Sequence, residues 1–249
     1  MDEFVGIASH ELRTPLTSIT ANVQLARRQL ERAGQQVARL EPTNSLRPPL
    51  ERSDLLLERT ERQIGRLDRL VGDPLDVSRI QAGKLEMRPE PCDLLEIVRD
   101  MVQEQRAAWP ARSIEVDLPQ RAMLLAIADP DRIGQVVTNF LSNALKYSMP
   151  DQPISVRVQR HGAVARVEVR DHGPGLTVDQ QAHLFEQFYR MPSIEQQSGS
   201  GVGLGLGLHI CRTIVERHDG REGVKSKPGA GSTFWLTLPL PDDQGAFRV

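Results

Sequence analysis

Three polar side chains near the start of the chain have the types and spacing of a phosphoryl-transfer site. On a helix through FVGIASHELRTPL, His10 lies about 200° beyond Ala8, away from the apolar residues, and is therefore exposed. An imidazole nitrogen can attack a phosphoryl group when a carboxylate takes the proton from the other nitrogen, and Glu11 can do this. Thr14 shares the face of His10 and could orient a water, or could bond back to a carbonyl one turn earlier. By itself, His10 also fits a solvated surface histidine, so the hypothesis needs support from the rest of the chain.

The segment NFLSNALKYS places two asparagines on one helix face. Asn139 and Asn143 are four residues apart, and Lys146 lies in the next turn. Amide oxygens suit Mg2+, which is usually shared with nucleotide phosphates and water, and a lysine can meet a phosphate as a point charge. One helical asparagine is usually a surface residue. Two on one face, beside the apolar residues Phe140 and Leu141, favour a binding site.

Two glycine-containing segments could accommodate a nucleotide. In EVRDHGPGL a buried Asp171 could accept from the exocyclic amine of adenine, while Gly173 and Gly175 let the backbone approach a flat base. The same residues also suit a plain turn. In SGSGVGLGLGLHI five glycines precede a helix whose first N–H groups can bind phosphate, although such a run can also be a flexible linker. No strand leads into this run and the Walker pattern is absent, which argues against Rossmann and P-loop sites.

The composition is that of an ordinary soluble chain. Its 249 residues carry 31 basic and 33 acidic side chains, a formal charge of -2, so we expect no nucleic-acid partner. Cys92 and Cys211 have neither disulfide nor zinc spacing and suit a reducing, cytoplasmic compartment. No apolar run approaches the roughly 18 residues that cross a bilayer, so any membrane contact would come through segments absent from this chain. The helical pattern is already under way at Met1, and we expect further sequence before it.

The elements that must position these residues begin with two long amphipathic helices. Apolar or small residues recur every three or four positions from Val5 to Leu40, and again from Leu50 to Ser78 after the proline-containing break EPTNSLRPP. This pattern predicts an antiparallel helical hairpin over residues 1–82. One hairpin buries too little apolar surface, so we expect a homodimer in which two hairpins form a four-helix bundle. Pro74 lies inside the second helix and should kink it.

Residues 83–92, GKLEMRPEPC, indicate a linker, after which short helices and strands alternate over residues 93–241. The strands ISVRVQR and AVARVEVR flank His161-Gly162, which predicts an antiparallel hairpin. We therefore predict an α+β protein, in which the helical hairpin is followed by a two-layer α/β sandwich. Residues 242–249 would be a tail.

In order along the chain, these segments resemble the sensor histidine kinase family, from Phe4 to about Leu240. FVGIASHELRTPLTSI is similar to the H-box of that family, DRIGQVVTNFLSNALKYS to its N-box, and DHGPG to its first glycine box. LFEQFYR resembles the F-box, GVGLGLGLHI the second glycine box, and GAGSTFWLTLPL the last glycine box with the closing strand. The resemblance implies a dimerisation and histidine phosphotransfer hairpin, followed by an ATP-binding domain of the Bergerat type that DNA gyrase and MutL share.

The resemblance also implies a role for individual residues. His10 would be the phosphoacceptor, Glu11 its acid/base partner, and Thr14 the residue that assists dephosphorylation of a partner. Asn143 would hold Mg2+, and Asp171 would recognise adenine. The other residues expected to contact the nucleotide or shape its pocket are Asn139, Lys146, Tyr147, Gly173, Gly175, Arg190, Gly203, Gly205, Leu206 and Gly207.

The implied function is Mg2+- and ATP-dependent autophosphorylation of His10, followed by phosphoryl transfer to an aspartate on the receiver domain of a response regulator. Thr14 also suggests the reverse, phosphatase, activity. The F-box and the polar loop of residues 187–201 would form a mobile lid, with Phe185 and Phe188 as its hydrophobic hinge. A core role for these two phenylalanines is the alternative. Two rival functions stay open: a non-kinase ATPase of the same superfamily, and a catalytically silent scaffold that binds receivers.

Three positions depart from the family pattern. Pro74 stands where the family usually has a helix-compatible apolar residue. Asp219 stands where the family usually has glycine, and Glu222 stands where an apolar strand residue is usual. A charged Glu222 would be costly if it faced the interior.

Overall fold

The structure, a computed structural model, describes residues 17–31, 47–119, 123–190 and 204–241. The chain divides into two compact units, Met1–Leu75 and Asp76–Val249. The division falls inside helix α2 (Arg47–Gln81), one residue after Pro74, and the helix continues through this proline. It lies upstream of residues 83–92, the linker that the sequence predicts.

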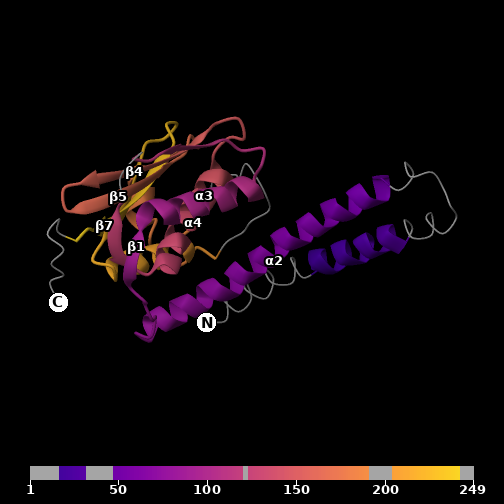
Figure 1. Cartoon of the computed structure of the whole chain (residues 1–249), viewed down its shortest axis with the longest axis horizontal. Coiled ribbons are helices and arrows are strands. Elements are labelled where there is room, and N and C mark those ends of the chain that lie inside the picture. The colour runs from indigo at the N-terminus through magenta and orange to yellow at the C-terminus, as the bar shows by residue number, and fades with distance from the viewer. Residues whose placement is uncertain (1–16, 32–46, 120–122, 191–203, 242–249) are drawn as a thin grey trace. The chain divides into compact units, whose positions relative to one another are not determined.

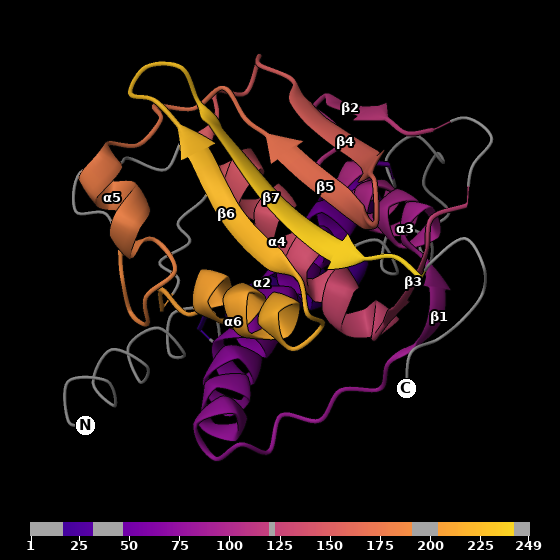
Figure 2. The same cartoon turned by 90° about the vertical axis from the view of Figure 1, so that its left-hand side faces the viewer.

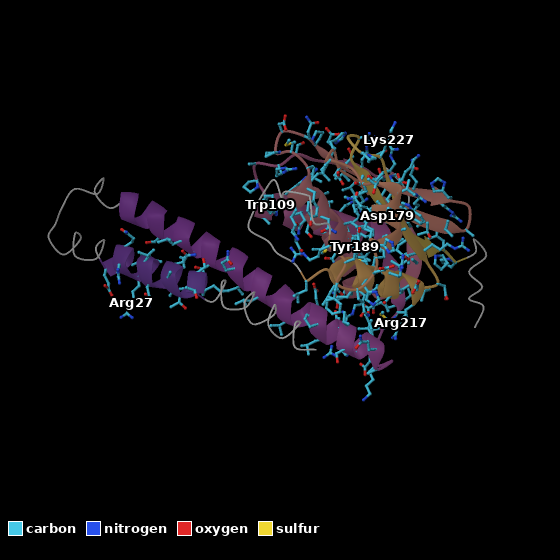
Figure 3. All side chains as sticks on the ribbon, turned by 180° about the vertical axis from the view of Figure 1, so that it is seen from behind. Arg27, Trp109, Asp179, Tyr189, Arg217 and Lys227 are labelled. Atoms are coloured by element: carbon cyan, nitrogen blue, oxygen red, sulfur yellow. The ribbon has the colours of Figure 1, made fainter. Side chains whose placement is uncertain are left out.

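The first unit contains two helical segments that lie side by side (Figure 1). Residues 17–31 are helical and pack beside the first part of α2. Small residues make this contact: Ala26 and Ser53 are buried, and the Ser53 hydroxyl donates to the Ala26 carbonyl at 3.5 Å. Arg27 is exposed and pairs with Glu31 one turn later (Figure 3). The described residues therefore confirm the helical N-terminal part that the periodicity predicts.

The second unit is built on a mixed sheet with the strand order β2-β4-β5-β7-β6 (Figure 2). These strands are β2 (Ile114–Asp117), β4 (Ile154–His161), β5 (Val164–Arg170), β6 (Arg221–Ser226) and β7 (Ser232–Pro239). β2 is parallel to β4, and all other neighbours are antiparallel. On one face Val167 pairs with Leu236 and Val169 with Phe234, and all four side chains are buried. The core of the unit therefore lies against this face.

Helices pack on the buried face of the sheet and complete the predicted α/β sandwich. They are α3 (Leu94–Ala108), α4 (Pro130–Tyr147) and α6 (Gly207–Glu216), and α3 and α4 lie behind the sheet in Figure 2. Asp129 fixes the start of α4, because its Oδ1 accepts from the Arg132 N–H at 3.1 Å. The N–H of Asp129 in turn donates to Nε2 of the buried His218 at 2.9 Å. No helix within the described ranges combines the length and the apolar composition that a membrane span requires.

Three short elements escape the sequence patterns. β1 (Glu90–Asp93) pairs with β3 (Leu125–Ala128) in a separate antiparallel ribbon, so residues 90–92 of the predicted linker are strand. Helix α5 (Val178–His183) starts at a capping box formed by Thr177 and Gln180. β1 and β3 have four residues each and α5 has six, and over so few positions a strand or helical period is easily missed.

Candidate nucleotide-binding site

Helix α4 presents the two predicted asparagines from a well-buried helix. Asn139 and Asn143 are half-buried, whereas Phe140 and Leu141 are fully buried. A Cβ on Gly207 would lie 3.0 Å from Oδ1 of Asn139, so the first residue of α6 packs directly against this asparagine. The structure thus brings the N-box segment and the second glycine segment together.

The far end of α4 meets the first glycine segment. Lys146 and Tyr147 are half-buried in the last turn of the helix. A Cβ on Gly173 would lie 2.8 Å from the carbonyl oxygen of Tyr147 and 2.9 Å from Oδ1 of Asp171. Only glycine fits there, so the backbone after Asp171 can pass close to the end of α4.

Asp171 is buried just beyond β5, with one carboxylate oxygen held by the backbone. Its Oδ1 accepts from the N–H of Gly173 at 2.8 Å and from the N–H of Ser232 at 3.2 Å. Among the described residues no hydrogen bond engages Oδ2, which leaves this oxygen to accept from a ligand. Burial raises the pKa of the Asp171 carboxyl above its usual value, and the bonds from Gly173 and Ser232 oppose the rise.

Two glycines with positive φ close the backbone around Asp171. Gly175 has φ +69°, and a Cβ there would lie 2.0 Å from the carbonyl oxygen of Lys227. Gly231 has φ +78°, and its Cβ would lie 2.1 Å from the carbonyl oxygen of Asp171. A side chain at either position would push the neighbouring backbone away. These glycines therefore keep the residues after β5, the loop at Lys227 and the start of β7 in contact.

The second glycine segment is a tight turn held by the residues that follow α5. Gly205 has φ +71° and Phe188 has φ +61°, and the N–H of Phe188 donates to the carbonyl of Gly205 at 3.1 Å. Leu206 is the N-cap of α6 and makes no side-chain capping bond, so the first N–H groups of α6 can serve an anion. Arg190, the last described residue before 191–203, is exposed.

Several predicted residues lie outside the described ranges. They include the proposed phosphoacceptor site of His10, Glu11 and Thr14, and also Gly203. The predicted tail, 242–249, and most of the predicted lid lie outside them as well.

Sequence reasoning overlooked Gly231 and Ser232 as parts of the site. Both contact Asp171 across 60 or so residues of chain, as the hydrogen bond from Ser232 shows. The signal was present in GAGSTFWLTLPL, because this segment resembles the last glycine box, although the resemblance by itself assigned no contact to its residues.

Two of the departures from the family pattern, Asp219 and Glu222, have distinct structural outcomes. Glu222 does face the helices, since it pairs in register with the buried Leu236, and its Oε1 is 2.9 Å from Nε of Arg212. The charge is therefore partnered. Asp219 adopts φ +53°, the left-handed conformation that glycine takes without strain.

Comparison with known proteins gives two family matches in the order that the sequence predicts. Residues 1–83 match the His Kinase A (phospho-acceptor) domain, and residues 128–242 match the histidine kinase-, DNA gyrase B- and HSP90-like ATPase family. The second match implies ATP as the nucleotide. It covers the part of the chain that carries Asn139, Asn143, Asp171 and the glycine segments.

Individual relatives agree with both matches. The alginate biosynthesis sensor protein KinB of Pseudomonas aeruginosa is 32% identical over 96% of this chain, which spans 37% of the length of KinB. The solved mycobacterial sensor histidine kinase MprB is 28% identical, covers 61% of this chain and 98% of its own, and has a TM-score of 0.53. The Acinetobacter baumannii histidine kinase AdeS shares the fold over 94% of this chain and 98% of its own, at 22% identity and a TM-score of 0.59. A phospho-acceptor region, a nucleotide site around Asp171 and these relatives together make the chain a member of the two-component sensor histidine kinases, of which it carries the catalytic core.

Proposed function

We propose that this chain uses Mg2+ and ATP to phosphorylate His10 and then passes the phosphoryl group to an aspartate of a response-regulator receiver domain. The observation that carries the proposal is the geometry of Asp171. Its Oδ1 is occupied by two backbone N–H groups, and within the part of the chain that the structure describes the other oxygen is left for a donor. The exocyclic amine of adenine is such a donor, and Gly173 leaves room for its flat ring.

The phosphates would lie between α4 and the start of α6. The uncapped N–H groups after Leu206 and the partial positive charge of that helix end favour an anion. Asn139 packs against Gly207 at this point. Lys146 and Arg190 would add positive charge, and Tyr147 would line the adenine side of the pocket.

The residues present fit a magnesium ion that is shared with the nucleotide. Asn143 offers an amide oxygen on the same face as Asn139, and Mg2+ prefers oxygen ligands. The described residues include no group of three His, Cys, Asp or Glu side chains that could hold an ion by themselves. Asn143 would therefore be one ligand, and phosphate oxygens and water would supply the others. The bound ion would neutralise charge on the phosphates.

In the transfer step a neutral nitrogen of His10 would form a bond to the γ-phosphorus, and the bond from this phosphorus to the β,γ-bridging oxygen would break. ADP leaves with that oxygen. Glu11 would accept the proton from the other imidazole nitrogen and stabilise the cation that forms. The ATP-binding domain, residues 93–241 with the linker 83–92, would have to approach the hairpin of residues 1–82 for this reaction.

Exposed apolar residues support the homodimer. On helix 17–31 Val23 and Leu30 are exposed, and on α2 Leu57, Ile64 and Val71 are exposed, each seven residues after the last. A seven-residue step keeps side chains on one stripe of a supercoiled helix. A second copy of the hairpin would cover both stripes and complete a four-helix bundle.

Transfer from His10 to a receiver aspartate would follow on the same hairpin. Thr14, one turn after His10, would orient water to hydrolyse the phosphorylated receiver, which gives the opposing phosphatase activity. Attachment to a membrane would require segments that are absent from this chain.

Incubation of the full chain with γ-labelled ATP and Mg2+ tests the proposal. The label should appear on protein, survive alkali and be lost in acid, as phosphohistidine is, and His10→Ala should remain unlabelled. Asp171→Asn should abolish labelling because nucleotide binding is lost. Label that persists in His10→Ala would rule out His10 as the acceptor.

The same experiment separates the two rival functions. A non-kinase ATPase would release phosphate steadily and leave the protein unlabelled. A silent scaffold would bind a receiver domain without labelling itself or hydrolysing ATP. Either result would overturn the kinase proposal.

A further inference from the structure

Arg212 joins three elements next to the glycine turn. From α6, its Nε lies 2.9 Å from Oε1 of Glu222 on β6. Its guanidinium carbon lies 4.9 Å from the ring centroid of Phe185, which follows α5. Phe185 is buried, and the Glu222 side chain is only 7% exposed, whereas that of Arg212 is 38% exposed. The ion pair and the ring contact therefore form one partly enclosed cluster.

The sheet does not need the Glu222–Arg212 ion pair for its stability. Glu222 pairs with Leu236 on the buried face, where an apolar side chain would fill the same space. Replacing a buried ion pair by apolar residues of similar volume is often neutral or stabilising. The carboxylate of Glu222 instead fixes the orientation of the Arg212 side chain, because it holds the guanidinium over the ring of Phe185.

Phe185 belongs to the segment that rests on the second glycine turn. Three residues later, Phe188 donates its N–H to the carbonyl of Gly205 at 3.1 Å. A Cβ on Gly205 would lie 2.7 Å from the carbonyl oxygen of Tyr189, so the two backbones are in direct contact. A shift of residues 184–190 would therefore move the turn at Gly205 and Leu206, from which α6 starts.

We propose that Arg212 is a positioning residue for the phosphates of the nucleotide. Held by Glu222 and stacked on Phe185, it keeps residues 184–190 against the Gly205 turn, so that the N–H groups at the start of α6 keep one geometry. Arg212 itself does not touch the nucleotide. This inference rests on the proposed nucleotide site and names a residue that governs its phosphate end alone.

The sheet supplies a matched control on strands β5 and β7. Nε of Arg166 lies 2.6 Å from Oε1 of Glu168, and its guanidinium carbon lies 4.2 Å from the ring centroid of Trp235. This cluster has the same chemistry, an arginine held by a glutamate over an aromatic ring. It lies outside the nucleotide site, so Arg166→Met removes equivalent contacts without touching the Gly205 turn.

Calorimetric titration of the full chain with ATP and Mg2+, and separately with adenosine, tests the role of Arg212. We expect Arg212→Met to weaken ATP binding about tenfold and adenosine binding by less than about twofold, because the adenine contact at Asp171 is separate. Glu222→Gln should change binding in the same direction, and the double variant should be no weaker than Arg212→Met. Arg166→Met should alter neither affinity.

Glu222→Leu distinguishes positioning from plain stability. We expect its melting temperature to equal or exceed that of the unmodified chain while its ATP affinity falls and its adenosine affinity is kept. In autophosphorylation the KM for ATP should rise with little change in kcat. Equal losses for ATP and adenosine, or unchanged ATP affinity in Glu222→Leu, would overturn the inference. An unmodified chain that binds no ATP would instead overturn the proposed nucleotide site.

Discussion

Oδ2 of Asp76 lies 2.8 Å from Nη1 of Arg132, which ties the last turns of α2 to the first turn of α4. Gln135 joins the contact by donating to the same oxygen at 3.1 Å. Arg132, Gln135 and Asn139 follow one another on a single stripe of α4, so the tie continues the face that carries the predicted phosphate contact. The residues from Asp76 onward thus belong to the ATP-binding unit, and we expect motion between the units to centre on Pro74 and Leu75.

Removal of this tie should loosen the end of α2. Asp76→Ala should cost about 1–3 kcal/mol locally, because the side chains of Asp76 and Arg132 are only 11% and 21% exposed. Hydrogen exchange should become faster in residues 76–85. Asp117→Ala is the control. Asp117 pairs with Arg157 at the same 2.8 Å, but the two side chains are 66% and 52% exposed. Removal of this exposed pair should therefore change hydrogen exchange little. Equal effects of the two substitutions would contradict the assignment of the tie.

Asp171→Asn should remove ATP binding while leaving the fold intact. The amide oxygen would take over the bonds from Gly173 and Ser232, and the amide N–H2 would then face the donor amine of adenine. The melting temperature without nucleotide should be unchanged or higher, because a charge that burial disfavours is gone. Calorimetric titration checks the loss of ATP binding, and thermal unfolding of the same sample checks the melting temperature. A variant that is unfolded without nucleotide would refute the expectation.

The pH dependence of Asp171 should have opposite signs for binding and for stability. Burial raises the pKa of its carboxyl, so ATP affinity should be complete above that raised pKa and fall as the pH drops through it. Without nucleotide, the contribution of Asp171 to stability is greatest below the pKa that its carboxyl has in the unfolded chain. It is lost as the pH rises through the higher pKa that the carboxyl has in the folded chain. Unfolding of the unmodified chain and Asp171→Asn should be compared from about pH 4 to 8. A stability difference that does not change with pH would contradict the buried carboxylate.

Asp219→Gly should stabilise the second unit. Asp219 has φ +53°, and glycine adopts that conformation without strain, so we expect a gain of about 0.5–1 kcal/mol in unfolding free energy. Urea denaturation measures it. Gly175→Ala tests the converse. Gly175 has φ +69°, and the added Cβ would lie 2.0 Å from the carbonyl oxygen of Lys227, so the substitution should be strongly destabilising. A destabilised Asp219→Gly would mean that the aspartate side chain has a role of its own.

Local patterns in the sequence predicted the α+β architecture and pointed to several of the residues that the structure places around the candidate site. The three-and-four spacing predicted the helical pair, and alternation predicted β4, β5 and β7. Asn139 and Asn143 could be placed on one face because residues four apart on a helix must share it. Asp171 was singled out because a carboxylate and two glycines follow a strand, a pattern that lies within five residues of chain.

Contacts between distant segments could not be predicted in the same way. Asp76 and Arg132 are separated by 56 residues, and Asp171 and Ser232 by 61. Neither pair has a period that points from one partner to the other, and the resemblance of GAGSTFWLTLPL to the last glycine box did not link Ser232 to Asp171. Glu222 is the instructive case, because its charge looked costly in a strand, and only the approach of Arg212 from α6 shows how the charge is partnered.

The position of the division after Leu75 has a practical consequence for anyone who wishes to produce the nucleotide-binding part by itself. A fragment that starts at residue 93, where the sequence places the domain, would lack the carboxylate that Arg132 and Gln135 bind. It would also lack the carbonyl of the buried Leu85, to which Arg217 at the end of α6 donates. Arg132 and Arg217 would then face solvent without these partners. A fragment that begins at Asp76 keeps both, and should be the more soluble and the more heat-resistant of the two.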